Sequence, residues 1–414
     1  MTSGTSYILS PNAPISDART PASKQQLHVL TLTPFFPHLS NPVYGAYISE
    51  PMGRLAEFNM RSTVIGVSPL HHKRRRSLPS APAEWLRYPA IPGNVGLTTG
   101  GWFLYRRLLP FVLRLHERHA VDLIHSHSAL PCGHAAYLLA ERMRIPFVVT
   151  VHGLDVFNAC FQPGAASSKV RAKLSAEIYR RAGSVICISR AIQDILQAGM
   201  QNPVSSHVIY NSTDPQLFFP EDCAVANRAP FILIVGNLLR GKGHELVLKA
   251  IARVAARFPN LHCVMIGEGP DQGLFANLAQ SLGIADRVSF RGRQDRQAVA
   301  KAMRECTVFA LPSHFEGLGC AYLEAMASAK PVIACEGQGI AEIIQHAQNG
   351  WLIPVDGLSE MTDALRQILS SPELRARLGA NARQTILSGF TLSDQARHLA
   401  ALYREVIGRD VTRT

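Results

Sequence analysis

Residues 315–324 read Phe-Glu-Gly-Leu-Gly-Cys-Ala-Tyr-Leu-Glu, and this decapeptide is the most informative stretch of the chain. The apolar run 307–311 before it predicts a short strand, and 323–327 after it predicts a helix. The glycines of 317–319 predict a tight turn between the two. A turn that leads from a strand into a helix presents free backbone N–H groups and the positive end of the helix dipole, so it predicts an anion site.

Two carboxylates, Glu316 and Glu324, stand eight positions apart around this turn. Carboxylates do not bind phosphate, but they accept hydrogen bonds from hydroxyl groups. A ligand that carries both a phosphate and many hydroxyl groups is a sugar nucleotide.

Apolar runs that alternate with helical stretches continue on both sides of the decapeptide, and they predict parallel sheets covered on both faces. The alternation begins at Leu27, breaks over 213–229 and restarts at Pro230. We therefore predict two doubly wound α/β domains, with ligands at the carboxyl ends of the strands and a crevice between the domains as the default site. The expected segments are a flexible tail over 1–24, a first domain over 25–212, a linker over 213–229, a second domain over 230–391 and a C-terminal helix over 392–410.

The composition is that of a folded protein, with 47% hydrophobic and 17% charged residues. No apolar run approaches the ~18 residues of a membrane span, and the N-terminus does not resemble a signal peptide. The eight cysteines are scattered without a Cys-x-x-Cys pair, a pattern typical of buried thiols in a reducing compartment. A cytoplasmic location is expected.

The net charge of +12 and a pI near 9.5 call for an anionic partner. No nucleic-acid-binding pattern is present, so nucleic acid is not expected. The densest basic run, 71–76, suits either an anionic membrane at the inner face of the plasma membrane or a solvated loop. Arginines and aromatic residues interleave over 85–114, which fits a membrane interface or a helix packed on the first domain. A positive field would also attract an anionic donor.

The spacing of Glu316 and Glu324, with the string Gly337-Gln338-Gly339-Ile340-Ala341-Glu342-Ile343-Ile344, resembles the Glu-x7-Glu signature of the retaining family-4 glycosyltransferases. The resemblance covers roughly residues 27–408. It implies the GT-B fold, in which two Rossmann-like domains face a central cleft and the last helix crosses back to the first domain. The resemblance is strongest to bacterial members that act on cell-surface polysaccharides.

In that family the first glutamate holds hydroxyls of the donor sugar, which falls on Glu316, and the second holds the ribose, which falls on Glu324. The turn at Gly317, Leu318 and Gly319 would support the phosphates of the donor.

The string 235–243 resembles the family's diphosphate loop, and its lysine, Lys242, would neutralise the leaving diphosphate. Many members have an arginine where this chain has Asn237, which puts the second phosphate contact in doubt. Arg240 could replace it from the same loop.

Glycines at three further positions match donor-binding loops of the family. Gly45 matches the loop held against the donor phosphates, where the missing side chain permits close approach. Gly267 and Gly269 belong to a Gly-Glu-Gly-Pro string that lines the nucleotide pocket. The stretch 267–273 also mimics a dinucleotide fingerprint, but its proline and its spacing make an NAD site a poor interpretation.

His152 closes a buried strand where the family places a histidine over the donor sugar. Asp155 follows it and is expected on the acceptor side. His127 belongs to a His-x-His pair that we interpret as acceptor-side or structural, because two ligands are too few for a metal site. No metal and no cofactor are expected.

The resemblance implies transfer of a hexose-type sugar from a UDP- or GDP-linked donor to a hydroxyl of a glycan or lipid-linked acceptor, with retention of configuration. Two alternatives stay open. One is a sugar-nucleotide epimerase of the same fold, and the other is a non-catalytic scaffold at the membrane.

Overall fold

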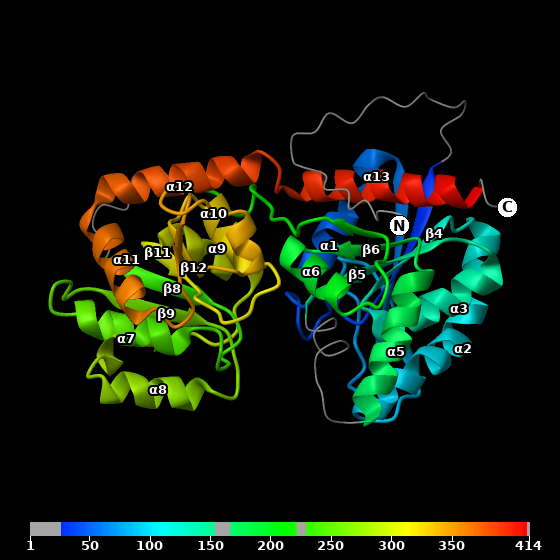
Figure 1. Ribbon diagram of the computed structural model, residues 1–414, viewed down its shortest axis with the longest axis horizontal. Helices are drawn as coiled ribbons and strands as arrows, with labels where there is room; N and C mark the ends of the chain where they lie inside the picture. Colours follow the sequence, from blue (N-terminus) through cyan, green and yellow to red (C-terminus); the bar gives the residue numbers. More distant parts are fainter. Residues whose placement is uncertain (1–25, 154–165, 222–228, 412–414) are drawn as a thin grey trace. The chain divides into compact units, whose positions relative to one another are not determined.

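The computed structural model describes residues 26–153, 166–221 and 229–411 of the 414-residue chain (Figure 1). The chain forms two compact units. The first contains the described residues up to Tyr210 together with those from Leu392 onward, and the second contains those from Asn211 to Thr391. Residues 213–221, the described part of the predicted linker before the gap, are therefore counted with the second unit.

The first unit is built on a seven-stranded parallel sheet in the order β3-β2-β1-β4-β5-β6-β7. Its strands are β1 (Leu27–Thr33), β2 (Met60–Pro69), β3 (Glu84–Tyr88), β4 (Leu123–His127), β5 (Phe147–Val151), β6 (Ser184–Cys187) and β7 (Ser206–Val208). The inner strands β4, β5 and β6 are buried along their whole length, as expected for a sheet covered on both faces.

Helices and short helical turns connect these strands. They are α1 (Ala46–Gly53), the 3₁₀ turn η1 (Leu55–Phe58), α2 (Asn94–Arg118), the π-helical turn η2 (Ala129–Gly133), α3 (His134–Met143), α5 (Ala166–Arg181), α6 (Arg190–Ala198) and α13 (Leu392–Val411). The last of these is the C-terminal helix, and its apolar side joins the core of the first unit through Leu399, Leu402, Tyr403 and Val406. The prediction that this helix returns to the first domain is confirmed.

The second unit has a six-stranded parallel sheet in the order β10-β9-β8-β11-β12-β13. Its strands are β8 (Phe231–Val235), β9 (His262–Ile266), β10 (Val288–Phe290), β11 (Val308–Ala310), β12 (Val332–Cys335) and β13 (Trp351–Ile353). The helical elements are α7 (His244–Val254), α8 (Gln272–Ser281), η3 (Ala285–Arg287), α9 (Arg296–Glu305), α10 (Cys320–Ala327), η4 (Gly339–Glu342), α11 (Leu358–Ser370) and α12 (Pro372–Leu387). Two doubly wound parallel sheets were predicted, and the structure confirms them.

Local sequence sets several helix starts. The Asp295 carboxylate accepts a hydrogen bond from the Ala298 amide at 2.8 Å at the start of α9. The Ser371 hydroxyl does the same for Leu374 before α12, where Pro372 occupies the first turn. Side-chain oxygens that accept from free amides of the first turn fix the residue at which a helix begins.

In each sheet, the order of the strands reverses at one point. In the first unit the chain moves outward from β1 to β3 and then returns to β4, and in the second it moves from β8 to β10 and returns to β11. The loops after neighbouring strands diverge at such a point, which leaves the carboxyl edge open for a ligand. Of the predicted site residues, Gly45 follows β1, His127 ends β4, Lys242 follows β8 and Glu316 follows β11.

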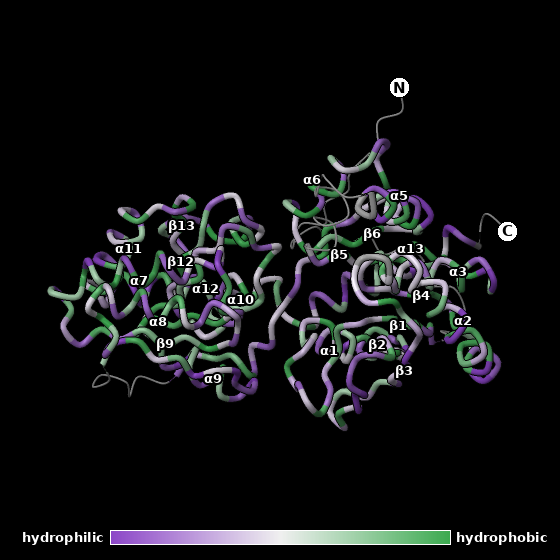
Figure 2. Tube along the Cα trace, turned by 90° about the horizontal axis from the view of Figure 1, so that it is seen from below, coloured by the Kyte–Doolittle hydropathy of each residue, from purple (hydrophilic) through white to green (hydrophobic). Residues whose placement is uncertain are grey.

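The arginine- and aromatic-rich segment forms the edge strand β3, which the sequence analysis did not foresee, and the long helix α2. One side of α2 is buried through Leu104, Leu108 and Val112, while Trp102 remains 50% exposed. Figure 2 shows hydrophobic (green) and hydrophilic (purple) residues alternating along α2. No helix in the described ranges combines the length and the apolar character needed to cross a bilayer.

Candidate functional site

In the second unit, Lys242 and Glu316 form an ion pair at the carboxyl edge of the sheet. Lys242 lies in the loop after β8, and Glu316 lies in the loop after β11. The Lys242 Nζ donates to Glu316 Oε2 at 2.6 Å, and both side chains are partly buried. The structure therefore brings together two residues that lie 74 positions apart in the sequence.

A close backbone contact holds these two loops together. Gly243 has φ of +80°, and a Cβ atom there would lie 2.2 Å from the carbonyl oxygen of Pro312. The His314 amide donates to the Gly241 carbonyl at 2.8 Å. Only glycine fits at position 243, whereas Gly241 shares the φ of +80° but has open space around its Cβ position.

The turn that carries Glu316 leads into α10 as predicted. Gly319 stands at the cap with φ of +80°. The Glu316 amide donates to Gln338 Oε1 at 2.7 Å, and the Gln338 side-chain amide donates to the His314 carbonyl at 2.9 Å. Gln338 thus orders the backbone of the turn, a role that the sequence analysis did not assign to it.

Glu324 lies one turn further along α10 and is only 6% exposed. Its Oε1 accepts a hydrogen bond from the Arg296 guanidinium at the first residue of α9. A buried carboxylate requires such a partner, because an uncompensated charge in the interior is strongly unfavourable. Arg296 was not among the predicted site residues, and no local motif marks it.

The predicted glycines after β9 serve loop packing. A Cβ atom on Gly267 would lie 1.9 Å from the Gly236 carbonyl oxygen, and one on Gly269 would lie 2.1 Å from that of Leu238. The two loops therefore touch backbone to backbone, and the Leu238 amide donates to the Glu268 carbonyl at 3.0 Å. These glycines place the β8 loop, and their role in donor binding stays a prediction.

Asn237 and Arg240 lie in the same loop, and both are exposed. The Arg240 backbone amide donates to Asp271 Oδ2 at 2.8 Å. Among the residues that the structure describes, no hydrogen bond joins the Arg240 guanidinium to Lys242 or Glu316. The idea that Arg240 replaces a phosphate contact stays a prediction.

In the first unit, two predicted histidines meet at the ends of β4 and β5. His127 Nδ1 lies 2.9 Å from His152 Nε2, and the rings stack with centroids 5.2 Å apart. Burial lowers the pKa of His152 to about 4 and the pKa of His127 well below its ordinary value. Both imidazoles are therefore neutral near pH 7, and each can donate one hydrogen bond and accept another.

A third imidazole continues the stack. The ring of His125 lies 4.4 Å from that of His127, and its nitrogens contact the Thr150 hydroxyl at 2.6 Å and the Tyr403 hydroxyl at 2.7 Å. Burial lowers the pKa of His125 to about 3. Tyr403 comes from α13, so the C-terminal helix fixes the base of the stack, a contact that the sequence analysis did not predict.

Aromatic rings enclose His152 from two other sides. Tyr47 of α1 and Phe35 after β1 meet it edge-on, with ring centroids at 5.0 and 6.4 Å. Gly45 precedes α1 with φ of +74°, and a Cβ atom there would lie 2.4 Å from the Phe35 carbonyl oxygen. Gly45 therefore lets α1 approach the β1 loop, which brings Tyr47 to His152. Asp155 lies outside the described residues.

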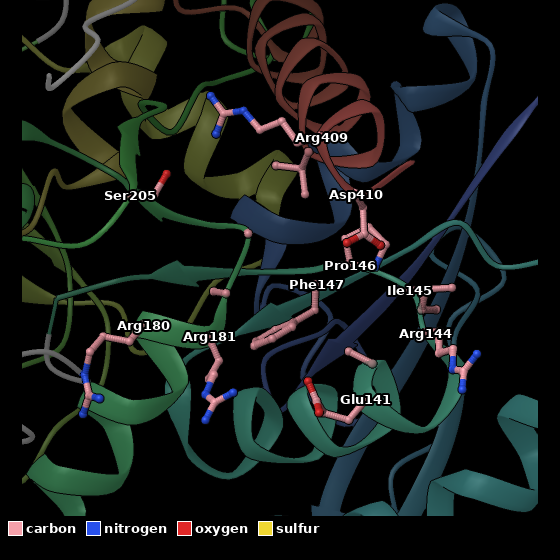
Figure 3. Close-up of a pocket in the computed structure, with 14 residues that line it drawn as sticks. Glu141, Arg144, Ile145, Pro146, Phe147, Arg180, Arg181, Ser205, Arg409 and Asp410 are labelled. Atoms are coloured by element: carbon pink, nitrogen blue, oxygen red, sulfur yellow. The ribbon is translucent and has the colours of Figure 1, made fainter. Parts of the chain in front are cut away.

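A hollow of 640 Å³ lies elsewhere in the first unit, and Figure 3 shows four arginines around it. It is formed by residues that precede β5, β6 and β7, at the amino ends of the strands. Arg180 and Arg181 are paired with Glu177 at 2.7 and 2.9 Å, and Arg409 is paired with Glu405. Helices α3, α5 and α13 end here, where basic side chains complement the helix dipole. The arginines thus have a structural explanation, and this hollow is not the candidate site.

Within the described ranges, no group of three or more His, Cys, Asp or Glu side chains is arranged to hold a metal ion. Lys242 and Arg296 both supply positive charge at the carboxyl edge of the second sheet.

Two family models match the chain in succession. The model described as Glycosyltransferase Family 4 matches residues 47–217, and the model described as Glycosyl transferases group 1 matches residues 218–385. The chain belongs to the family-4 glycosyltransferases. The matched ranges carry both the histidine stack and the Lys242–Glu316 pair.

Individual relatives agree with this assignment. The glycosyltransferase is 26% identical to the N-acetyl-alpha-D-glucosaminyl L-malate synthase of Bacillus anthracis, over 71% of this chain and 77% of the relative. It is 25% identical to the D-inositol 3-phosphate glycosyltransferase of Corynebacterium glutamicum, over 81% and 82% of the two chains. The structure of Anabaena HepE in complex with UDP superposes with a TM-score of 0.70 at 20% identity, covering 92% of this chain and all of HepE. The fold is GT-B, as predicted.

Proposed function

We propose that this glycosyltransferase moves a hexose-type sugar from a UDP- or GDP-linked donor to a hydroxyl of a glycan or lipid-linked acceptor, with retention of configuration. The observation that carries the proposal is the Lys242–Glu316 ion pair at the start of α10, because it places a cation for a diphosphate beside an acceptor for sugar hydroxyls. The complex of HepE with UDP supports a nucleotide-linked donor. We place the reaction in bacterial polysaccharide or glycolipid synthesis by analogy alone.

The residues of the second unit supply charge and orientation. When the donor binds, its diphosphate takes the place of Glu316 as the partner of Lys242, and Glu316 accepts hydrogen bonds from sugar hydroxyls. The bond from the anomeric carbon to the diphosphate breaks while the acceptor oxygen bonds on the same face. The departing phosphate oxygen takes the acceptor's proton, so the reaction requires no protein nucleophile. Lys242 stabilises the charge that develops on the leaving group, and the proposal requires no metal or cofactor.

The first unit contributes a neutral hydrogen-bonding group. Because the pKa of His152 is lowered to about 4, it can hydrogen-bond a sugar hydroxyl without adding charge. Its Nε2 lies in hydrogen-bond contact with His127 Nδ1, which orients the His152 ring.

A thermal-shift panel tests the donor assignment. UDP, GDP, ADP, dTDP and NAD are added to the wild-type protein and to Lys242→Ala, with Lys249→Ala, an exposed lysine of α7, as the control. We expect one nucleoside diphosphate to raise the melting temperature by several degrees, since a ligand at ~100 times its Kd adds about 2.7 kcal/mol. The shift should be lost in Lys242→Ala and kept in the control. Stabilisation by NAD alone, or by none of the five, would refute the proposal.

We further propose that α2 contacts an anionic membrane, which would suit a lipid-linked acceptor. Its solvent-facing side carries Trp102 together with Arg106, Arg107 and Arg114, all exposed. The basic run 71–76 lies in the same unit, but Arg75 packs on the Tyr44 and Trp85 rings and donates to the Pro34 carbonyl. The other basic side chains of the run 71–76 are exposed, so they can contact an anionic surface.

Vesicle co-sedimentation tests the membrane contact. The wild-type protein should pellet with vesicles that contain phosphatidylglycerol and stay in solution with phosphatidylcholine alone. Reversing two charges in Arg106→Glu/Arg107→Glu should weaken binding by about tenfold or more, given roughly 1 kcal/mol per basic residue. Arg366→Glu, an exposed residue of α11, is the control. Equal binding of all three proteins, or binding of none, would refute the membrane contact.

A cytoplasmic location is part of the same proposal. The cysteines within the described ranges are free thiols, and most are buried, as is usual for proteins of reducing compartments.

A further inference from the structure

Two arginines of α9 hold the short segment 217–219 in place within the second unit. The Arg304 guanidinium donates to the Leu217 carbonyl at 3.1 Å and lies 4.6 Å from the centroid of the Phe219 ring. The Arg296 guanidinium lies 4.9 Å from the centroid of the Phe218 ring, which is completely buried. Successive phenylalanines are thus covered by arginines that stand two helical turns apart on one helix.

The two arginines differ in what they contact next. Arg296 also bonds the Glu324 carboxylate, and Glu324 is the acid that the family resemblance assigns to the ribose. A guanidinium is planar, so it can stack its face on an aromatic ring while its edge donates to a carboxylate. Phe218 therefore holds the face of the Arg296 guanidinium, and the edge of the guanidinium holds the Glu324 carboxylate.

The bond from Arg296 determines which part of Glu324 remains for a ligand. Oε1 accepts from Arg296, so Oε2 is the oxygen with lone pairs for hydroxyl donors. Without the guanidinium, a carboxylate that is 6% exposed would lose its charge partner and its orientation together.

We propose that Arg296 is a positioning residue for nucleotide recognition: it aims Glu324 at the ribose hydroxyls, and Phe218 holds Arg296 in place. The inference rests on the proposed function, because it takes the ligand to be a nucleoside diphosphate. The inference adds that recognition of the ribose depends on the position of segment 217–219.

Deoxynucleotides provide the test. Affinities are measured for the nucleoside diphosphate that stabilises the wild-type protein and for its 2′-deoxy and 3′-deoxy forms. The wild-type protein should lose about tenfold or more in affinity with at least one deoxy form, the size expected for a hydrogen bond to a charged group. Arg296→Gln should bind the ribose form as weakly as that deoxy form, while its affinity for the deoxy form stays at the wild-type value.

Three variants complete the design. Arg304→Gln removes the matching arginine of α9, which does not touch Glu324, so it should keep the wild-type discrimination. Phe218→Leu should lower the discrimination in part, since Arg296 keeps its charge partner and loses its aromatic support. The discrimination of Arg296→Lys between ribose and deoxy forms should also fall between those of the wild-type protein and Arg296→Gln. If Arg296→Gln does not fold, Arg296→Lys and Phe218→Leu together provide the test.

Each other outcome contradicts the inference. Full discrimination in Arg296→Gln would mean that Glu324 needs no orientation by Arg296. Equal losses for ribose and deoxy forms would mean that Arg296 acts on another part of the ligand or on the fold. Tighter binding by Arg296→Gln would make the arginine a competitor of the ribose. If the wild-type protein binds no nucleoside diphosphate, the proposed function fails first, whereas a failure confined to the variants leaves that function intact.

Discussion

At the scale of single residues, the candidate site depends on charges that are paired before any ligand arrives. Lys242 holds Glu316 and Arg296 holds Glu324. Paired charges tolerate partial burial, and they hold both carboxylates oriented for hydroxyl donors. The local spacing of the two glutamates was visible in the sequence, but the choice of Arg296 as a partner depends on how α9 packs against α10. The sequence therefore predicted the two glutamates, but it did not reveal Arg296, the arginine that orients Glu324.

Replacing Glu316 should separate donor-sugar recognition from nucleotide binding. In Glu316→Gln the side chain keeps its size but loses its charge, so Lys242 becomes free for phosphate while the sugar hydroxyls lose a charged acceptor. We expect transfer to fall by about a hundredfold or more, and nucleoside diphosphate affinity to stay equal or to rise. Initial rates of transfer and calorimetric titration measure the two effects.

The control for this change is Glu245→Gln, a half-exposed glutamate of α7 that pairs with Lys249. It should leave both quantities unchanged. Wild-type turnover in Glu316→Gln would contradict the proposed role.

The histidine stack makes the stability of the first unit depend on pH. The pKa of His152 is lowered to about 4 and that of His125 to about 3, both by burial. The unfolded chain, with pKa values near 6.5, binds more protons below that pH than the folded chain does. Stability is therefore fully present above pH 6.5 and falls by a few kcal/mol as the pH approaches 4.

Urea unfolding at pH 7 and pH 5 measures this loss. In a Trp351→Phe background the remaining tryptophans, Trp85 and Trp102, both report on the first unit. Adding His152→Gln should reduce the difference between the two pH values, though not abolish it, because other buried imidazoles contribute. His262→Gln, an exposed residue of the second unit, should have no effect. An unfolding midpoint that is the same at both pH values would contradict the prediction.

At the scale of elements, strands with apolar runs were predicted well, and the edge strand β3 was not. The fully buried β5 and β6 were evident because a sheet covered on both faces needs apolar residues on both sides of each strand. The edge strand β3 was missed because Glu84–Tyr88 is exposed or half-buried over most of its length and mixes charge with aromatic rings. For the segment 85–114, the sequence left open whether it packs on the first domain or faces a membrane. The structure shows that α2 has one buried side and one exposed side.

Two glycines of the diphosphate loop allow backbone strain and close packing to be separated. Gly241 and Gly243 share φ of +80°, but only a Cβ atom on Gly243 would meet another backbone, at Pro312. Gly241→Ala should therefore cost about 1 kcal/mol of stability from the left-handed conformation alone. Gly243→Ala should cost more and should also weaken nucleoside diphosphate binding, because the loop that carries Lys242 must move away from the Glu316 loop.

Chemical denaturation and calorimetric titration of both variants measure the two effects. The comparison is internally controlled because the substitution and the φ angle are the same. Equal behaviour of the two variants would show that the Pro312 contact does not determine the position of Lys242.

At the scale of the whole molecule, the first unit is formed by two segments that are far apart along the chain. The last helix, α13, belongs to the first unit, where it contributes Leu399, Leu402 and Val406 to the core and Tyr403 to the histidine stack. The contact from Tyr403 to His125 joins residues 278 positions apart. Only the family resemblance predicted the return of this helix, since periodicity showed its apolar side but not its partner.

This division predicts that the second unit folds and binds nucleotide by itself. Residues 211–391 contain a complete sheet with its own covering helices, both ion pairs of the candidate site and the docked segment 217–219. The first unit is expected to behave differently. A chain that ends at Thr391 lacks α13, which leaves the buried faces of α1 and η1 exposed to water and His125 without its tyrosine.

Two truncated proteins measure the difference. The fragment 211–391 should unfold cooperatively and bind the nucleoside diphosphate with the affinity of the full chain, although it transfers no sugar. The fragment 1–210 should be unstable alone, because burial of α13 removes several large apolar side chains from water and each is worth about 1.5–3 kcal/mol. Its stability should return when residues 392–414 are fused to its end through a flexible linker. If 211–391 folds but binds no nucleotide, groups of the first unit must contribute most of the affinity, and Lys242 and Glu324 cannot be its principal source.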